Sequence, residues 1–275
     1  MNDYNLCVII PVHKPNLSED DQISLKACFE KLNQFASFLI YPEGMDVSQY
    51  LLIHPQLLLK SVDPLWLASI EGYNKMKLNI DFYNMFKQYQ YMLTYELDAY
   101  IFDSNICNSE YLNCDYIGAP YFEGYLNAAP NSPIIEGENS GFSIRNIQSC
   151  IYVLESIEHY NFEWKLYKHI FSKSRILRSA LNRLTRRRFE ALIYGQMSFH
   201  FSNEHFNEDM VWSRTIPHIF PKFKIADTKT AIKFSFEVNP DVLYEMNNHQ
   251  LPAGCHAWPK FRSFWKDYIP ELSNN

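Results

Sequence analysis

Apolar runs and amphipathic stretches alternate through the first part of the chain. Residues 7–12 (CVIIPV) are apolar and largely β-branched, which predicts a parallel strand buried on both faces. Residues 18–32 predict a helix with Ser18 as its N-cap, because the acids at 19–21 would then lie in its positive first turn. A second strand is expected at 37–41, ended by Pro42.

The middle of the chain continues this alternation. Apolar positions between 65 and 89 predict helices packed on one sheet face, and 91–102 reads as an apolar strand interrupted by two carboxylates. Further strands are expected near 116–119 and 141–144. Alternating strands and helices indicate the α/β class, with a doubly wound, mostly parallel central sheet flanked by helices.

The second half lacks an obvious boundary. A helix is expected from 147 to about 159, residues 162–201 read as largely helical, and 233–237 is a short strand-like piece. No linker composition separates the two halves. We therefore predict one domain spanning residues 1–275, with a basic helical insert at about 162–200.

The composition of the chain bears on its binding partners and on its cellular compartment. The net charge of −6 and the pI of about 5.8 disfavour nucleic acid as a partner, since phosphate binding needs a basic surface. Six cysteines without a CxxC pair indicate reduced thiols. The opening apolar run at 6–12 is too short to span a membrane and lacks the features of a signal peptide. A cytoplasmic protein is expected.

One stretch departs from this acidic balance. Nine Lys and Arg residues and no Asp or Glu lie between Lys165 and Arg188. If 170–188 is helical, its leucines share a face that arginines flank, a pattern suited to peripheral contact with the anionic inner face of the cytoplasmic membrane. The alternative is an ordinary amphipathic helix packed on the core with a solvated basic rim.

The first candidate site is the pair of acids in 91–102. Ligands of open α/β sheets bind beyond the carboxyl ends of the strands, where Glu96 and Asp98 would lie. Their i, i+2 spacing would place both side chains on one face of an extended strand, able to hold a divalent cation that bridges a diphosphate. Alternatively, they are sheet-end acids paired with nearby basic side chains.

A second acidic pair, Glu208 and Asp209, precedes an apolar turn, and either carboxylate can serve as a general base. The commoner meaning of such a string is that Asn207 is a helix N-cap with both acids in the first turn. The two roles are compatible, because a helix N-terminus can present a carboxylate to a cleft.

His256 and a glycine-containing segment complete the candidates. An imidazole can join carboxylates in a manganese or magnesium site, although a lone histidine is more often a satisfied core residue. Residues 137–145 form a turn-rich approach to a strand, where glycines allow close backbone approach to a ligand. This segment matches neither of the common phosphate-binding glycine patterns.

Taken in order, these blocks resemble a largely bacterial family of unknown function that is related to GT-A glycosyltransferases. The resemblance spans about residues 6–265, apart from the insert. The blocks are 8–15 (VIIPVHKP), 72–75 (GYNK), 95–99 (YELDA), 116–121 (YIGAPY), 141–145 (GFSIR), 207–209 (NED) and 251–258 (LPAGCHAW).

The resemblance implies roles for individual residues. Glu96 to Asp98 stands where the family's DxD motif binds metal and diphosphate, with Asp98 the better ligand, and His256 is similar to a late histidine that completes the metal site. Glu208 and Asp209 resemble the xED motif, whose Asp deprotonates the acceptor hydroxyl. The residues expected to bind the donor, including its base at the end of the first strand, are Pro11, Val12, Tyr73, Asn74, Lys75, Glu96, Asp98, Asn139 and Gly141.

The resemblance thus implies a GT-A-like fold and transfer of a sugar from a nucleotide-sugar donor, with UDP as the expected nucleotide and manganese or magnesium as the metal. The acceptor would be a glycan or a lipid-linked sugar in surface polysaccharide synthesis. Two alternatives stay open. One is a nucleotidyltransferase or sugar-nucleotide hydrolase. The other is a binding protein without turnover, which the Glu at the first DxD position keeps open.

Overall fold

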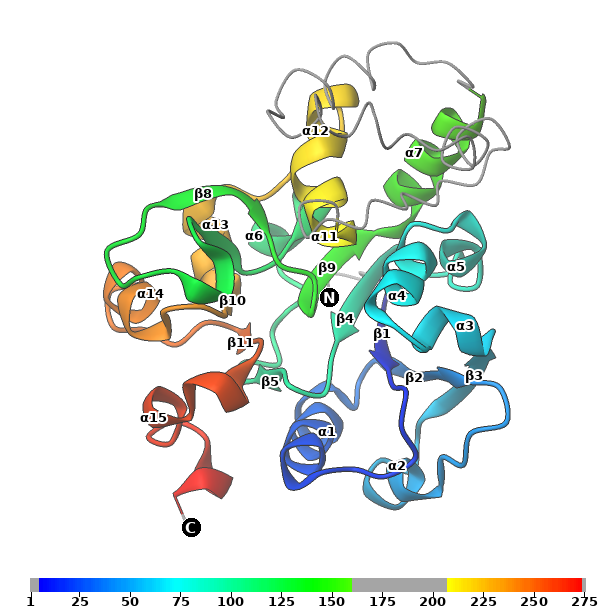
Figure 1. Cartoon of the computed structure of the whole chain (residues 1–275), viewed down its shortest axis with the longest axis horizontal. Coiled ribbons are helices and arrows are strands. Elements are labelled where there is room, and N and C mark those ends of the chain that lie inside the picture. Colours follow the sequence, from blue (N-terminus) through cyan, green and yellow to red (C-terminus); the bar gives the residue numbers. More distant parts are fainter. Residues whose placement is uncertain (1–4, 160–206, 274–275) are drawn as a thin grey trace, which may run out of the picture.

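A six-stranded sheet forms the centre of the molecule. The computed structural model describes residues 5–159 and 207–273 (Figure 1). The strand order is β3-β2-β1-β4-β9-β6. Strands β1 to β4 pair in parallel, whereas β9 runs antiparallel to both β4 and β6. The strand bounds are β1 Leu6–Pro11, β2 Ala36–Pro42, β3 Leu58–Val62, β4 Tyr91–Tyr95, β6 Tyr116–Ile117 and β9 Phe142–Asn146. The predicted α/β class and mostly parallel sheet are confirmed.

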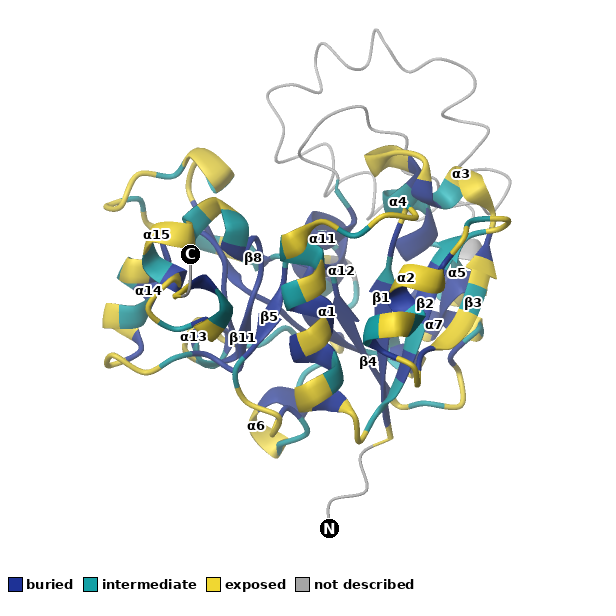
Figure 2. Ribbon diagram, turned by 90° about the horizontal axis from the view of Figure 1, so that it is seen from below, coloured by how far each residue is buried: buried dark blue, intermediate teal, exposed yellow. Residues whose placement is uncertain are grey.

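The two faces of β1 contribute to two separate cores. Val8 and Ile10 pack in one core with Leu25 of α1 (Glu19–Leu32), while Cys7 and Ile9 pack in the other. This follows from the two-residue repeat of a strand, which sends successive side chains to opposite faces. The burial view shows β1 and β4 as buried strands inside the molecule (Figure 2). An unbroken apolar run is therefore required here.

Helices cover both faces of the sheet (Figure 1). On one side lie α1 and α2 (Ser48–Ile53), and on the other α4 (Ile70–Lys77), α5 (Ile80–Asn84) and α7 (Ile147–His159). Helix α1 begins as predicted, because the Ser18 hydroxyl accepts a hydrogen bond from the Asp21 amide at 3.2 Å and the Asp21 carboxylate accepts one from the Ser18 amide at 2.7 Å.

The predicted strand at 91–102 is wrong in its second half. Strand β4 ends at Tyr95, and the backbone then turns, with the Ala99 amide donating to the Glu96 carbonyl at 2.8 Å. Strand β5 (Tyr100–Ile101) belongs to a different, three-stranded sheet. Glu96 and Asp98 therefore lie in a turn and not on one face of a strand.

The strand expected at 233–237 is also shorter than predicted. Helix α13 (Thr228–Phe234) occupies its beginning, and β10 covers only Ser235–Phe236. The Asp227 carboxylate caps α13 through the Thr230 amide at 2.9 Å, which favours the helix over a longer strand.

Short elements make up the rest of the described chain. The remaining strands are β7 Pro120–Phe122, β8 Ile134–Glu138 and β11 Gly254–Cys255, and the remaining helical segments are α3 Pro64–Leu67, α6 Ser109–Leu112, η1 Tyr125–Asn127, α11 Glu208–Met210, η4 Val211–Thr215, α12 Ile216–Ile219, α14 Pro240–Met246, η5 Trp258–Phe261, α15 Arg262–Trp265 and η6 Pro270–Leu272.

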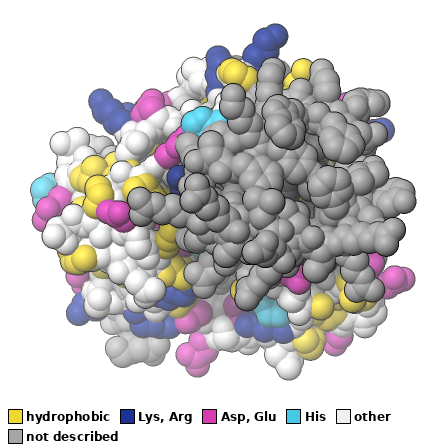
Figure 3. Space-filling view, turned by 45° about the horizontal axis from the view of Figure 1, so that its top comes forward, with side chains coloured by type: hydrophobic (Ala, Val, Ile, Leu, Met, Phe, Trp, Pro, Cys, Tyr) yellow, Lys and Arg dark blue, Asp and Glu magenta, His cyan; other side chains and the backbone are white. Residues whose placement is uncertain are grey.

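The basic insert predicted at 162–200 lies outside the described residues, so its helical character, its membrane contact and the single-domain boundary stay predictions. Within 5–159 and 207–273, no helix is both long enough and apolar enough to cross a membrane. On the face shown in Figure 3, the described part carries acidic, basic and apolar side chains side by side.

Candidate metal and donor site

The small sheet brings three polar residues to one place. Its strand order is β10-β11-β5, with β10 parallel to β11 and β11 antiparallel to β5. Glu237 directly follows β10, His256 directly follows β11, and Asp98 lies two residues before β5. Because β5 runs in the opposite direction, its beginning lies beside the ends of the other two strands. Each short strand thus delivers one side chain to the same edge.

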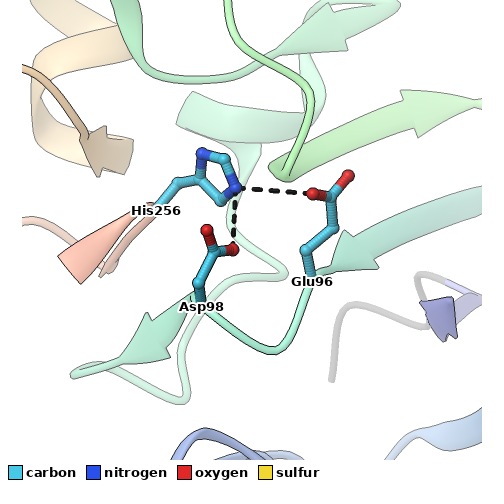
Figure 4. Close-up of side chains that lie close together, drawn as sticks. All are labelled: Glu96, Asp98 and His256. Atoms are coloured by element: carbon cyan, nitrogen blue, oxygen red, sulfur yellow. Dashed lines mark ion pairs between the residues drawn. The ribbon is translucent and has the colours of Figure 1, made fainter. Parts of the chain in front are cut away.

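Glu96, Asp98 and His256 form a compact cluster (Figure 4). The Nε2 atom of His256 lies 2.9 Å from an oxygen of Asp98 and 3.5 Å from an oxygen of Glu96. One ligand atom from each residue lies within 4.8 Å of the others. The structure therefore brings together Glu96, Asp98 and His256, the three residues that the sequence analysis proposed for a divalent cation.

Residues outside the cluster position His256 and Glu96 through hydrogen bonds. The other ring nitrogen of His256, Nδ1, lies 3.0 Å from Glu237 Oε1, and the same oxygen accepts from the Asn139 amide at 3.1 Å. The Tyr73 hydroxyl donates to Glu96 Oε1 at 2.7 Å. Glu237 was missed at the sequence level, although an acid directly after an apolar strand is the same signal that identified Glu96.

Gly141 gives His256 its space. A Cβ at this position would overlap the imidazole ring, so only glycine fits. Its amide donates to the Asn139 side chain at 2.7 Å, and its carbonyl accepts from the Glu96 amide at 2.9 Å. In this structure Gly141 lies against the His256 ring and Asn139 contacts Glu237, whereas the predicted role of both residues in donor binding stays a prediction.

The charges in the cluster stabilise one another. Burial by itself lowers the pKa of His256, but the charge of Asp98 and the close contacts with the neighbouring carboxylates raise that pKa well above its usual value. Burial raises the pKa of Glu96 and of Asp98, and the nearby His256 more than reverses this, so both carboxyl pKa values are lowered. Without a metal the imidazolium serves as the cation, and a metal ion would displace its proton.

A cavity of about 510 Å³ opens beside the cluster. It lies at the carboxyl ends of β1 and β4, where open α/β sheets bind ligands. Its volume is typical of small-molecule sites. The lining residues are Pro11, Val12, His13, Lys14, Asp21, Tyr50, Leu67, Ala68, Ser69, Ile70, Tyr73, Glu96, Leu97 and Asp98. Five of the predicted site residues are among them, namely Pro11, Val12, Tyr73, Glu96 and Asp98.

Asn74 and Lys75 do not line this cavity. The Asn74 side chain connects α4 to α11, because its amide donates to Asn207 at 3.3 Å and its carbonyl accepts from the Glu208 backbone at 3.1 Å. Lys75 pairs with Glu71 one turn earlier on α4, at 3.1 Å. Neither contact is with the cluster of Glu96, Asp98 and His256, and the predicted role of Asn74 and Lys75 in donor binding stays a prediction.

The second acidic pair is buried at the start of α11. The Arg145 Nη2 atom donates to both oxygens of Glu208, at 2.8 and 3.1 Å. The Asp209 carboxylate accepts hydrogen bonds from the Tyr121 hydroxyl and, at 2.7 Å, from the Met210 amide. Burial and the charge of Glu208 raise the pKa of Asp209 to about 7. Within the described part of the chain, Asp209 contacts no cation, and its pKa lies near neutrality.

Asn207 has the backbone position of an N-cap, but its side chain makes no capping hydrogen bond. It accepts from Asn74 instead. The capping interpretation is therefore correct about position: Asn207 is the N-cap residue and both acids lie in the first turn. It is wrong about the side chain, which does not cap the helix.

Two buried cations behind the site were not identified from the sequence. Arg145 on β9 and Lys77 on α4 are both fully buried. The Lys77 ammonium donates to the Thr94 hydroxyl at 2.5 Å, and burial together with the charge of Arg145 lowers its pKa to about 7. The sequence pattern around a lysine or arginine does not indicate whether its charged group will be buried, so the burial of Lys77 and Arg145 could not be predicted.

Fold and site together define an α/β protein with a cavity at the carboxyl ends of its strands and a Glu, Asp, His cluster beside it. The chain matches the family described as "Protein of unknown function (DUF5672)" over residues 56–256 and belongs to that family. The resemblance to a family of unknown function is thereby confirmed. No curated protein matches the chain by sequence.

Several solved structures align with most of the chain. Mouse xyloside xylosyltransferase 1 in its apo form is 11% identical, with 91% of this chain and 97% of that chain covered and a TM-score of 0.48. The galactosyltransferase LgtC in complex with donor and acceptor sugar analogs is 10% identical, with 97% and 95% covered and a TM-score of 0.49. A glycosyltransferase involved in the glycosylation of the major capsid of PBCV-1 is 11% identical, with 91% and 93% covered and a TM-score of 0.42.

Proposed function

We propose that this protein is a metal-assisted glycosyltransferase that uses a nucleotide-sugar donor. The observation that supports this most directly is the position of Glu96 and Asp98, which line the cavity while His256 lies beside them. A donor with a diphosphate at the cluster would have its nucleoside in the cavity, against Pro11 and Val12 at the end of β1. This orientation follows the general rule for ligands of open α/β sheets.

The cluster has the chemistry of a manganese or magnesium site. Two carboxylates and one imidazole are suitable ligands for these ions. His256 Nε2 is buried and has no hydrogen bond of acceptable geometry within the described residues, although it lies at ion-pair distance from Asp98. An orphaned ring nitrogen facing two carboxylates fits a metal ligand. A bound cation there would neutralise charge on a departing nucleoside diphosphate.

The protein's own residues provide the other functions. Tyr73 orients Glu96 through its hydroxyl, and Tyr50 shapes the cavity wall by donating to the Lys14 carbonyl at 2.5 Å. We assign the general base to Asp209. Its pKa of about 7 suits proton removal from an acceptor hydroxyl near neutral pH, and the Glu237 carboxylate is close enough to contribute to that raised pKa.

Further parts of the proposal rest on the sequence alone. We assign UDP as the nucleotide, a glycan or lipid-linked sugar as the acceptor, and peripheral membrane contact through 165–188 on the cytoplasmic side. Surface polysaccharide synthesis is the process that would use such a transfer.

The test is calorimetric titration of nucleoside diphosphates with and without manganese. We expect manganese to strengthen UDP binding by wild-type protein, and Asp98→Asn or His256→Ala to remove this gain. A charge-assisted contact contributes about 1.5–3 kcal/mol, so the loss should be about 10- to 100-fold. Asp241→Asn, at an exposed position on α14, is the matched control and should bind as wild type.

Product analysis then separates the candidate activities. Sugar transferred to an acceptor supports the proposal. Release of free sugar with every acceptor offered would indicate a hydrolase, and metal-dependent donor binding without turnover would indicate a binding protein. If manganese leaves UDP, GDP and CDP affinities of the wild type unchanged, the metal site is not where we place it.

A further inference from the structure

Glu237 lies directly behind the metal cluster and is almost fully enclosed, with 4% of its surface exposed. Its Oε1 atom receives two contacts, from His256 Nδ1 at 3.0 Å and from the Asn139 amide at 3.1 Å. An ionised carboxylate only accepts hydrogen bonds. The proton shared between Glu237 and His256 must therefore be carried by Nδ1.

The orientation of Asn139 supports this assignment independently. Its side-chain oxygen accepts from the Gly141 backbone amide at 2.7 Å, and a backbone amide can only donate. The nitrogen of the Asn139 side chain is therefore the atom that faces Glu237, as a donor. A backbone group of known polarity thus sets the direction of the hydrogen bonds from Gly141 to Asn139 and from Asn139 to Glu237, so Oε1 of Glu237 is an acceptor in this chain.

The consequence appears at the opposite ring nitrogen. In a neutral ring with the proton on Nδ1, Nε2 carries a lone pair. That atom is directed toward Asp98 and Glu96, and it has no hydrogen bond of its own among the described residues (Figure 4). Because Gly141 has no Cβ, the ring can occupy this position without steric conflict. Tautomer and ring orientation therefore both suit a metal ligand.

We propose that Glu237 is the positioning residue of the metal site, and that its hydrogen bond holds His256 with the proton on Nδ1 and with Nε2 free to bind a divalent cation. This inference rests on the proposed metal site and extends it to a residue that does not touch the metal. Loss of such an outer-shell carboxylate typically weakens metal binding by about 10- to 100-fold.

The test combines an affinity measurement with a direct view of the histidine ring. Manganese binding to the full chain is measured from the electron paramagnetic resonance signal of the free ion, for wild type, Glu237→Gln and the exposed control Glu245→Gln on α14. Proton and ¹⁵N correlation spectra, with His256→Asn for assignment, identify which ring nitrogen carries the proton. These spectra are recorded without metal and with magnesium.

We expect Glu237→Gln to bind manganese about 10- to 100-fold more weakly, and Glu245→Gln to bind as wild type. The wild-type spectrum should show a hydrogen-bonded proton on Nδ1 of His256 that Glu237→Gln shifts or loses. A proton on Nε2 alone in the magnesium-loaded wild type, or unchanged manganese affinity in a folded Glu237→Gln protein, would overturn the inference.

The spectrum of wild-type protein needs no variant, so the inference stays testable if Glu237→Gln does not fold. It also separates two kinds of failure. If wild type binds no manganese, the proposed metal site is wrong. The metal-free spectrum still shows whether Nδ1 of His256 carries a proton that is hydrogen-bonded to Glu237. If Nδ1 carries no such proton, Glu237 is not the positioning residue.

Discussion

The two acidic pairs of this protein look alike in sequence and differ in their surroundings. Glu96 and Asp98 lie in a turn at the cavity, with 28% and 39% of their side chains exposed, and the group that faces them is a histidine. Glu208 and Asp209 are buried at the start of α11. There, Arg145 neutralises Glu208, and Asp209 has no cationic partner among its described contacts.

The difference teaches what each pair can do. A partly exposed cluster in which a proton on His256 offsets part of the charge of two carboxylates can exchange that proton for a metal ion, because metal binding and ligand deprotonation are coupled. In the buried pair, one carboxylate is paired with the permanent cation Arg145 and the other has no cationic partner among its described contacts. The unpaired carboxylate has a raised pKa, which is the property of a general base.

The largest expected effect comes from removing the proposed base. Asp209→Asn should lower kcat by about 10²- to 10⁴-fold and leave donor affinity close to wild type, because a general base acts mainly in the transition state. Steady-state kinetics and donor titration measure the two quantities. Glu208→Gln is the internal comparison, and a larger loss of kcat there with the fold intact would mean that the other carboxylate is the base. Full activity in both would show that the chemistry does not depend on this pair.

The next effect concerns stability. Arg145→Met removes the only cation that contacts Glu208 in the described structure, and an uncompensated buried charge costs about 3–5 kcal/mol. Urea denaturation should show this loss in the free energy of unfolding. The double replacement Arg145→Met with Glu208→Leu should recover much of it, since both charges are then gone. If wild type and Arg145→Met have similar free energies of unfolding, the buried Glu208 carboxylate does not need the ion pair with Arg145.

The smallest effect is a shift in pH dependence. Asp209 must be deprotonated to act, so kcat/KM should rise as pH increases through about 7. The Tyr121 hydrogen bond favours the charged carboxylate and lowers this pKa, so Tyr121→Phe should move the rising limb to higher pH. Tyr125→Phe, on the neighbouring ring, is the control. If the rising limb of the kcat/KM profile stays in place in Tyr121→Phe, or moves to lower pH, the group that titrates is not Asp209.

Local patterns predicted those elements that depend mainly on nearby residues. The strand at β1 follows from an apolar run that can only be buried on both faces, and α1 follows from a capping box within four consecutive residues. The break after Tyr95 was missed because its apolar continuation, 99–102, is equally compatible with a straight strand. The turn occurs there because β5 finds its partner in β11, about 150 positions later in the chain.

The candidate site divides in the same way. Residue type and strand-end position indicated the acids Glu96 and Asp98, and the family resemblance then singled out Asp98, His256 and Asp209. Glu237 and Arg145 were not selected, because their importance comes from a histidine and a carboxylate that lie far away in sequence.

The sequence by itself thus determined the α/β class, the buried strands and the kinds of group available for metal binding and proton transfer, because burial and capping depend on local composition. The tertiary structure decided which carboxylate is neutralised by Arg145, which nitrogen of His256 faces Glu96 and Asp98, and that Gly141 makes room for its ring. Electrostatic energies depend on distances and burial set by several elements at once, and no single segment carries that information.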